Sequence, residues 1–135
     1  MIKLSQVIFS GEKKPIKKPA AKPFFVYQKI YDFNLFVYPL INKIPRFHKQ
    51  VLGKYILEIC TLLLVLVIKA NKERGQTRKN LQQKISYNLD CLRIFIRLTK
   101  DLKFISIKNY LAAAEKLNEI GRMLSSWMKV WKSLK

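Results

Sequence analysis

The residues of this chain with the most evident chemistry are basic, and they are densest in one short segment. That segment holds Lys69, Lys72, Arg74, Arg78 and Lys79, with only Glu73 opposing them. Like charges at this density repel one another unless an anion docks on them, and Lys and Arg are the side chains that contact phosphate groups. We therefore expect this segment to bind a polyanion, and a solvated turn is the alternative.

A second basic group lies further along the chain, where Arg93, Arg97 and Lys100 share one face by helical spacing. Asp90 precedes Arg93 by three residues and Asp101 follows Arg97 by four, so both arginines have a carboxylate within reach. We favour structural pairing for these two arginines, with phosphate contact as the alternative. The further candidates for phosphate contact are Arg122, Lys129 and Lys132.

Two tryptophans, Trp127 and Trp131, are interleaved with Lys129 and Lys132 near the end of the sequence. Aromatic rings beside cations can stack on unpaired bases. Tryptophans more often anchor a hydrophobic core or an interface between proteins, and we favour that role here.

Residues for catalysis or metal binding are scarce. The only histidine is His48, the glycines are scattered, and Cys60 and Cys91 both lie in apolar stretches typical of reduced core cysteines. A metal cage built from Cys and His is difficult to assemble from this set. We expect no catalytic residue, no metal and no cofactor.

The overall charge has the same implication as the local clusters. Lys and Arg number 27 against 8 Asp and Glu, a formal net charge of +19 in 135 residues, while 50% of the residues are hydrophobic. This composition indicates a folded domain with a polyanionic partner. RNA or DNA is the first expectation and an anionic membrane surface the alternative. Reversing the charges of Arg74 and Arg78 is expected to weaken RNA binding and leave the fold intact.

The elements that position these side chains are predicted to be helices. Apolar residues at three-four spacing predict helices over residues 25–43, 46–73, about 77–103 and 107–134. Gly75 is the expected C-cap of the second helix, Thr77 the expected N-cap of the third, and Ser106 that of the fourth. Four long helices with short links indicate an all-α fold, an antiparallel four-helix bundle.

Two regions are expected. Residues 1–23 form a basic, proline-containing arm and residues 24–135 the bundle domain. The longest apolar run, between Lys54 and Lys69, is shorter than the roughly 20 residues that span a bilayer. We expect a cytoplasmic protein without a membrane partner.

The second helix is apolar on two sides, whereas one bundle core buries a single stripe. The extra stripe predicts contact between copies of the chain, and a wide core filled from within one chain is the alternative. The predicted interface residues are Leu57, Thr61, Leu64, Ile68 and Trp127.

Two stretches resemble a known family: residues 89–103 (LDCLRIFIRLTKDLK) and residues 119–129 (EIGRMLSSWMK). Both are similar to the accessory variability determinant (Avd) family of diversity-generating retroelements. Tyr31-Asp32, Tyr38-Pro39 and Leu52-Gly53 fall in the expected order upstream. The segment 47–53 and the turn 72–76 depart from the family pattern.

The resemblance implies a basic four-helix bundle assembled as a ring-like homopentamer. Such proteins bind nucleic acid and the element's reverse transcriptase, and they support mutagenic copying of template RNA into cDNA without an active site of their own. Arg93, Arg97 and Arg122 correspond to arginines of the family. The implied location is a prokaryotic cytoplasm, with the gene in a cell or a phage. The alternatives are a bundle protein associated with intervening sequences of ribosomal RNA and a general polyanion or membrane-surface binder.

Overall fold

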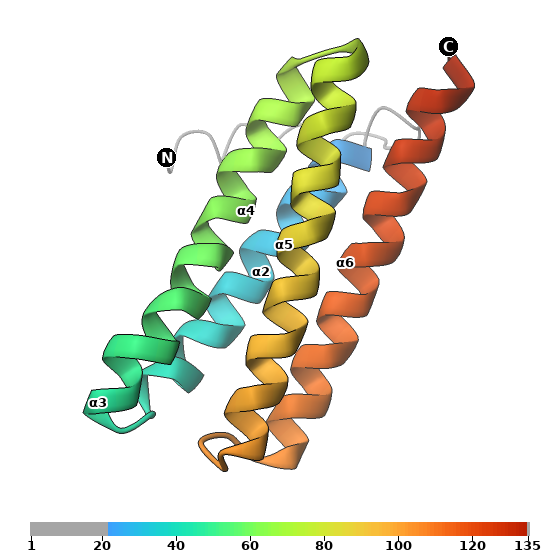
Figure 1. The fold of residues 1–135 in the computed structure, drawn as a ribbon. Coiled ribbons are helices and arrows are strands. Elements are labelled where there is room, and N and C mark those ends of the chain that lie inside the picture. The colour runs from blue at the N-terminus through green and yellow to red at the C-terminus, as the bar shows by residue number, and fades with distance from the viewer. Residues whose placement is uncertain (1–21, 135) are drawn as a thin grey trace.

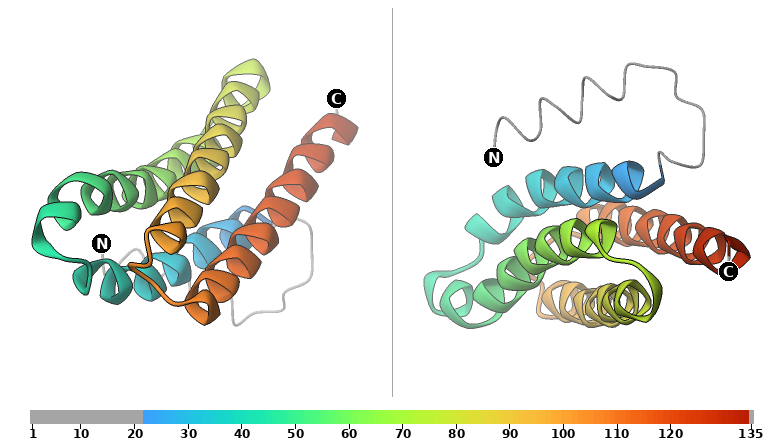
Figure 2. Two further views of the ribbon diagram at one scale, coloured as in Figure 1. Left: turned by 60° about the horizontal axis from the view of Figure 1, so that its bottom comes forward. Right: turned by 90° about the horizontal axis from the view of Figure 1, so that it is seen from above.

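The computed structural model describes residues 22–134, and the environments of the side chains of residues 25–129. Its four long helices are α2 (Lys22–Asn42), α4 (Lys54–Lys72), α5 (Gly75–Asp101) and α6 (Ile107–Leu134). They run alternately up and down, and α2 and α5 each pack against α4 and α6 (Figure 1). The view from above shows the four helices around one core (Figure 2). The predicted four-helix bundle is confirmed, and the predicted arm lies almost wholly outside the described residues.

The core is built from stripes of apolar residues, one from each helix. Phe33, Ile56, Leu89 and Leu117 represent the four stripes, and each is at most 1% exposed. The one buried asparagine among the described residues, Asn34, donates its amide N–H groups to the carbonyl oxygens of Ile30 at 3.0 Å and Cys60 at 3.1 Å. A buried amide needs such partners, and this one ties α2 to α4.

The second predicted helix is divided into three pieces. A short α3 (Arg46–His48) leads into a π-helical turn, η2 (Lys49–Gly53), which continues directly into α4. Gly53 is buried at this turn, where a Cβ atom would lie only 2.8 Å from Ile41 Cγ2. The glycine therefore allows the widened turn to approach α2 closely, which the apolar periodicity alone did not indicate.

The helix ends confirm one predicted cap and correct two others. The Ser106 hydroxyl accepts a hydrogen bond from the Asn109 N–H at 3.0 Å, as expected of an N-cap. Gly75 is not the C-cap of α4: it has φ +59° and begins α5. Thr77 lies within α5, because the reversal between α4 and α5 uses only Glu73 and Arg74.

The continuous helical stretch Arg46–Lys72, with a mean hydropathy of 2.3 in its most apolar window, is long and apolar enough to cross a membrane. It agrees with the helix predicted over residues 46–73, and it extends beyond the apolar run between Lys54 and Lys69 that alone is too short to span a bilayer. The core helix of a soluble bundle meets the same criterion, and α4 contributes six buried residues to this core. One such helix is weak evidence for a membrane span.

Burial gives Cys60 a testable effect on stability. Its thiol is fully buried, and burial raises its pKa to about 12 from an ordinary 9.0. Above about pH 9 the thiol ionises in the unfolded chain but not in the folded one, so the free energy of unfolding falls as pH rises. The contribution is at most about 1.4 kcal/mol per pH unit.

We expect Cys60→Ala to remove this contribution. Urea unfolding of both proteins from pH 7 to 10 should give a shallower decline for the variant, whatever its stability at pH 7. Cys60→Val, which also lacks the thiol, should give the same shallower decline. If the free energy of unfolding fell equally steeply with pH in Cys60→Ala and in the parent protein, the raised pKa of Cys60 would not be the cause of the decline.

Candidate nucleic-acid interface

The densest basic cluster occupies the end of the bundle at which α4 passes into α5 (Figure 1). Lys69, Lys72 and Arg74 are exposed there, and Lys79 is half-buried. Within the described part of the chain, none of these four side chains makes an ion pair. We call this cluster the basic end. Its charge is free to act on an external anion.

Arg78 differs from its neighbours in the cluster because its guanidinium group is engaged within the fold. Its Nε donates to the carbonyl oxygens of Ala70 and Glu73, both at 2.9 Å, and its Nη2 donates to that of Asn71 at 3.1 Å. The last carbonyls of a helix have no partners within it, and they carry the negative end of the helix dipole. Burial, and then the charge of Arg74, lower the pKa of Arg78. Arg78 is thus the cap of α4, and reversing its charge is not expected to leave the fold intact.

The end of α6 lies beside the same corner. The Arg78 guanidinium carbon is 5.8 Å from the centroid of the Trp127 ring, and Trp127 is 2% exposed. The tryptophan is therefore a core residue, as the sequence favoured, and its burial removes it from any surface between copies. Lys129 is exposed one half-turn further on, whereas the side chains of Trp131 and Lys132 lie outside the described residues. Arg78 and Trp127, far apart in sequence, thus bring the α4–α5 corner into contact with α6.

The arginines in the lower half of α5 are paired as their spacing predicts. Arg93 Nη1 lies 2.8 Å from Asp90 Oδ1, and Arg97 Nε lies 3.7 Å from Asp101 Oδ2. Lys100 Nζ is 2.9 Å from Asp101 Oδ1, and its hydrogen bond lowers the pKa of that carboxyl group. These pairs offset much of the charge on this part of α5, so it presents a weaker field than the basic end.

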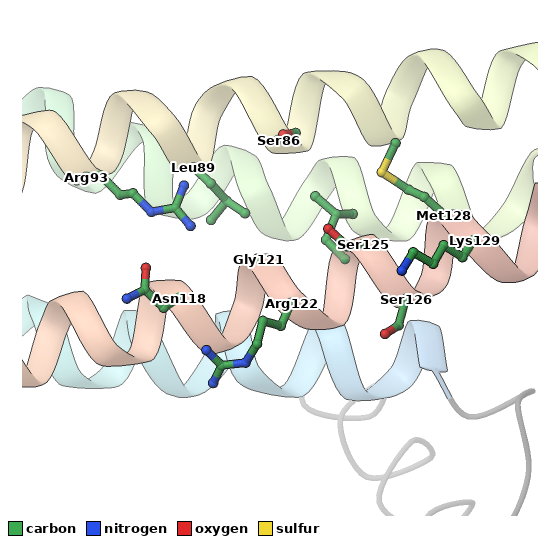
Figure 3. A pocket seen from close by; sticks show the side chains of 11 residues that line it. Ser86, Leu89, Arg93, Asn118, Gly121, Arg122, Ser125, Ser126, Met128 and Lys129 are labelled. Carbon is green, nitrogen blue, oxygen red and sulfur yellow. The ribbon is translucent and has the colours of Figure 1, made fainter.

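A groove of about 660 Å³ lies between α5 and α6 (Figure 3). Arg93 reaches into it from α5, and Arg122 and Lys129 are lining residues of the α6 wall, where the guanidinium group of Arg122 points away from α5. Arg93 Nη2 donates to the carbonyl oxygen of Leu117 at 3.4 Å and lies where a Cβ on Gly121 would come within 2.8 Å of it. Each of these three cations was a candidate predicted from the sequence, but the sequence did not predict that they line one groove. The feature of the sequence that could have indicated the groove is the group of small residues on α6: Gly121, Ser125 and Ser126.

The predicted interface residues on α4 are partly covered within the chain. Leu57, Leu64 and Ile68 are half-buried and pack against the core, and the exposed Thr61 donates its hydroxyl to the carbonyl oxygens of its own helix. Other apolar side chains are more exposed, and the rings of Tyr55 and Phe95, 6.3 Å apart, join them across α4 and α5. We call these exposed side chains the α4–α5 apolar face: Val51, Tyr55, Leu62, Val65, Tyr87, Ile94 and Leu98.

A comparison of the sequence with known protein families identifies the family to which this bundle belongs. The model of the bAvd-like family matches residues 24–131, which is most of the chain. The chain belongs to the bAvd-like family. This confirms the resemblance carried by residues 89–103 and 119–129. No curated protein matches the chain.

The bAvd-like chain brings no three His, Cys, Asp or Glu side chains together as a metal site within its described residues. Its two cysteines are both free. The side chains that the fold does gather are cations and hydroxyl groups, at the basic end and in the groove. These groups suit electrostatic and hydrogen-bonded contact with an anion.

The role of Arg78 as a cap leads to a prediction about stability. Arg78→Met keeps an unbranched side chain but removes the hydrogen bonds to the carbonyl oxygens of Ala70 and Asn71 in α4 and of Glu73 after it, so we expect the free energy of unfolding to fall by about 1–3 kcal/mol. Arg74→Met is the matched control, because that side chain makes no capping hydrogen bond, and it should change stability by less than about 0.5 kcal/mol. Urea unfolding measures both. Equal effects of the two substitutions would show that Arg78 does not cap α4.

Proposed function

We propose that this bAvd-like protein is a non-catalytic, nucleic-acid-binding accessory subunit of a diversity-generating retroelement. In this role it binds the reverse transcriptase and the template RNA and supports mutagenic cDNA synthesis. The family match over residues 24–131 carries the proposal. The cluster of exposed, unpaired cations at the basic end supports its nucleic-acid component.

The basic end suits binding to the phosphate backbone. Lysine and arginine contacts to phosphates release counterions, which makes affinity high at low salt and steeply dependent on salt concentration. Contacts of this kind position a nucleic acid without reading its bases. The polymerase chemistry belongs to the reverse transcriptase, and the bundle contributes a binding surface.

We further propose that copies of the chain assemble, as a ring-like homopentamer by analogy with the family. The α4–α5 apolar face supports this, because extended apolar surface on a soluble protein usually marks an interaction site. Assembly would repeat the basic end around a ring, and weak contacts on each copy would then combine by avidity. We propose that the protein is located in the cytoplasm of a prokaryotic cell, and that its retroelement is carried by the cell's own genome or by a phage.

The proposal is tested by purifying the tagged protein from its native host, washing it across a salt series and identifying the RNA and proteins that remain. We expect a reverse transcriptase together with one discrete, structured RNA. Recovery of ribosomal RNA precursors would instead favour the family associated with intervening sequences. Heterogeneous RNA that is lost at moderate salt, without a polymerase, would indicate a general polyanion binder.

The basic end makes a separate prediction about affinity. We expect Lys69→Glu combined with Arg74→Glu to weaken RNA binding about tenfold or more, and to reduce the slope of log affinity against log salt by about 2. Lys54→Glu combined with Lys108→Glu is the control: it makes the same change in charge at exposed positions on the opposite end of the bundle. Fluorescence anisotropy measures both proteins. Equal losses would show that total charge matters and the basic end does not.

Assembly makes a prediction about mass. Ile94→Arg places a charge in the α4–α5 apolar face, where Ile94 is 65% exposed, so we expect smaller species by light scattering. Leu35→Arg, at a position on α2 that is 62% exposed, is the matched control and should retain the mass of the parent protein. An unchanged mass for Ile94→Arg would remove this face as the interface.

A further inference from the structure

We propose that the groove between α5 and α6 binds the phosphodiester backbone of a single nucleic-acid strand. This inference rests on the proposed nucleic-acid function and assigns part of it to a second surface, apart from the basic end. It starts from the chemistry of the walls. The three cations that line the groove are Arg93, Arg122 and Lys129, and no carboxylate lines it.

Hydroxyl groups complete the polar part of the groove. Ser86 on α5 and Ser125 and Ser126 on α6 are among its lining residues, and small side chains keep it open (Figure 3). Guanidinium groups, ammonium groups and hydroxyls are the side-chain donors that contact phosphate oxygens in nucleic-acid complexes. The cations and hydroxyl groups of the wall are therefore hydrogen-bond donors that suit phosphate oxygens.

The spacing of the cations suits a row of phosphates. Arg122 and Lys129 are seven residues apart on α6, so they lie on one face and are separated by roughly 10 Å along the helix axis. A nucleic-acid strand carries a phosphate on every nucleotide, so a bound strand can place a different phosphate at each of the two cations. A single small anion would use only one end of such a site.

The floor of the groove distinguishes a single strand from a duplex. Met128 lines it as a partly exposed side chain, above Leu89 and Leu124, which are almost fully buried. The exposed part of Met128 offers apolar contact to the face of a base or a ribose. Those faces are accessible in an unpaired strand, whereas a duplex keeps its bases stacked inside.

Gly121 sets the position of the Arg93 guanidinium group. Arg93 donates to Asp90 Oδ1 and to the Leu117 carbonyl oxygen while passing over Gly121. A Cβ at position 121 would lie 2.8 Å from Nη2, the mobile end of the arginine, so an alanine there displaces the guanidinium group and leaves the backbone in place. Gly121→Ala thus changes the groove without changing any charge, and alanine is the better helix former.

The test measures binding of the full chain to three fluorescent probes: single-stranded oligouridine, an RNA duplex of equal length and polyglutamate. Arg122→Gln combined with Lys129→Gln is expected to weaken binding of the single strand about tenfold. Lys84→Gln combined with Lys108→Gln removes the same charge from exposed positions of α5 and α6 outside the groove, and should change affinity less than about twofold. Gly121→Ala should weaken binding several-fold without lowering Tm.

Each other outcome overturns the proposal in a distinct way. If the groove variants lose no more affinity than the control pair, while Lys69→Glu with Arg74→Glu still weakens binding, the groove is excluded and the nucleic-acid function stands. If the parent protein binds no RNA, the proposed function fails first. If the groove variants weaken binding of the RNA duplex as much as binding of the single strand, the preference for a single strand is excluded. If they weaken binding of polyglutamate as much as binding of the single strand, the ligand of the groove is an acidic protein segment.

Discussion

Repulsion among the basic side chains is the constraint that the rest of this structure has to satisfy. The bundle keeps these charges outside an apolar core, and it engages several of them in local contacts. Arg78 binds the carbonyl end of α4, Arg93 and Arg97 pair with aspartates, and Lys29 reaches Glu119 across two helices at 3.2 Å. The charge that remains is concentrated in particular places, and those places become candidates for binding.

Several features of the fold followed from the sequence because they depend on local spacing. Three-four periodicity located all four helices, and the distances from Asp90 to Arg93 and from Arg97 to Asp101 predicted their ion pairs. The N-cap at Ser106 could be predicted for the same reason, since a capping hydroxyl bonds within its own first turn.

The features that sequence reasoning missed depend on contacts between helices or on backbone conformation. A glycine can adopt the positive φ found at either end of a helix, so the sequence alone does not say whether Gly75 ends α4 or begins α5. It begins α5 because the reversal between the two helices is only two residues long. The capping role of Arg78 requires α4 and α5 to be side by side, and the common groove of Arg93 and Arg122 requires α6 beside α5. Such juxtapositions are properties of the assembled bundle. The interface residues predicted on α4 are mostly half-buried within the chain, because apolar residues surround this helix and periodicity does not say which of them its neighbours cover.

The π-helical turn η2 has a consequence for the surface of this bundle. A turn of this kind holds one residue more than a regular α-helical turn. The extra residue rotates α3, which precedes the turn, about the helix axis relative to α4. Loss of one residue between 49 and 53 would leave charge and composition almost unchanged, yet it would turn α3 by about 100°. Phe47, 69% exposed on α3, would then face a different side of the molecule. Single-residue insertions and deletions here are thus a route by which homologous bundles can redirect an aromatic contact while their cores stay the same.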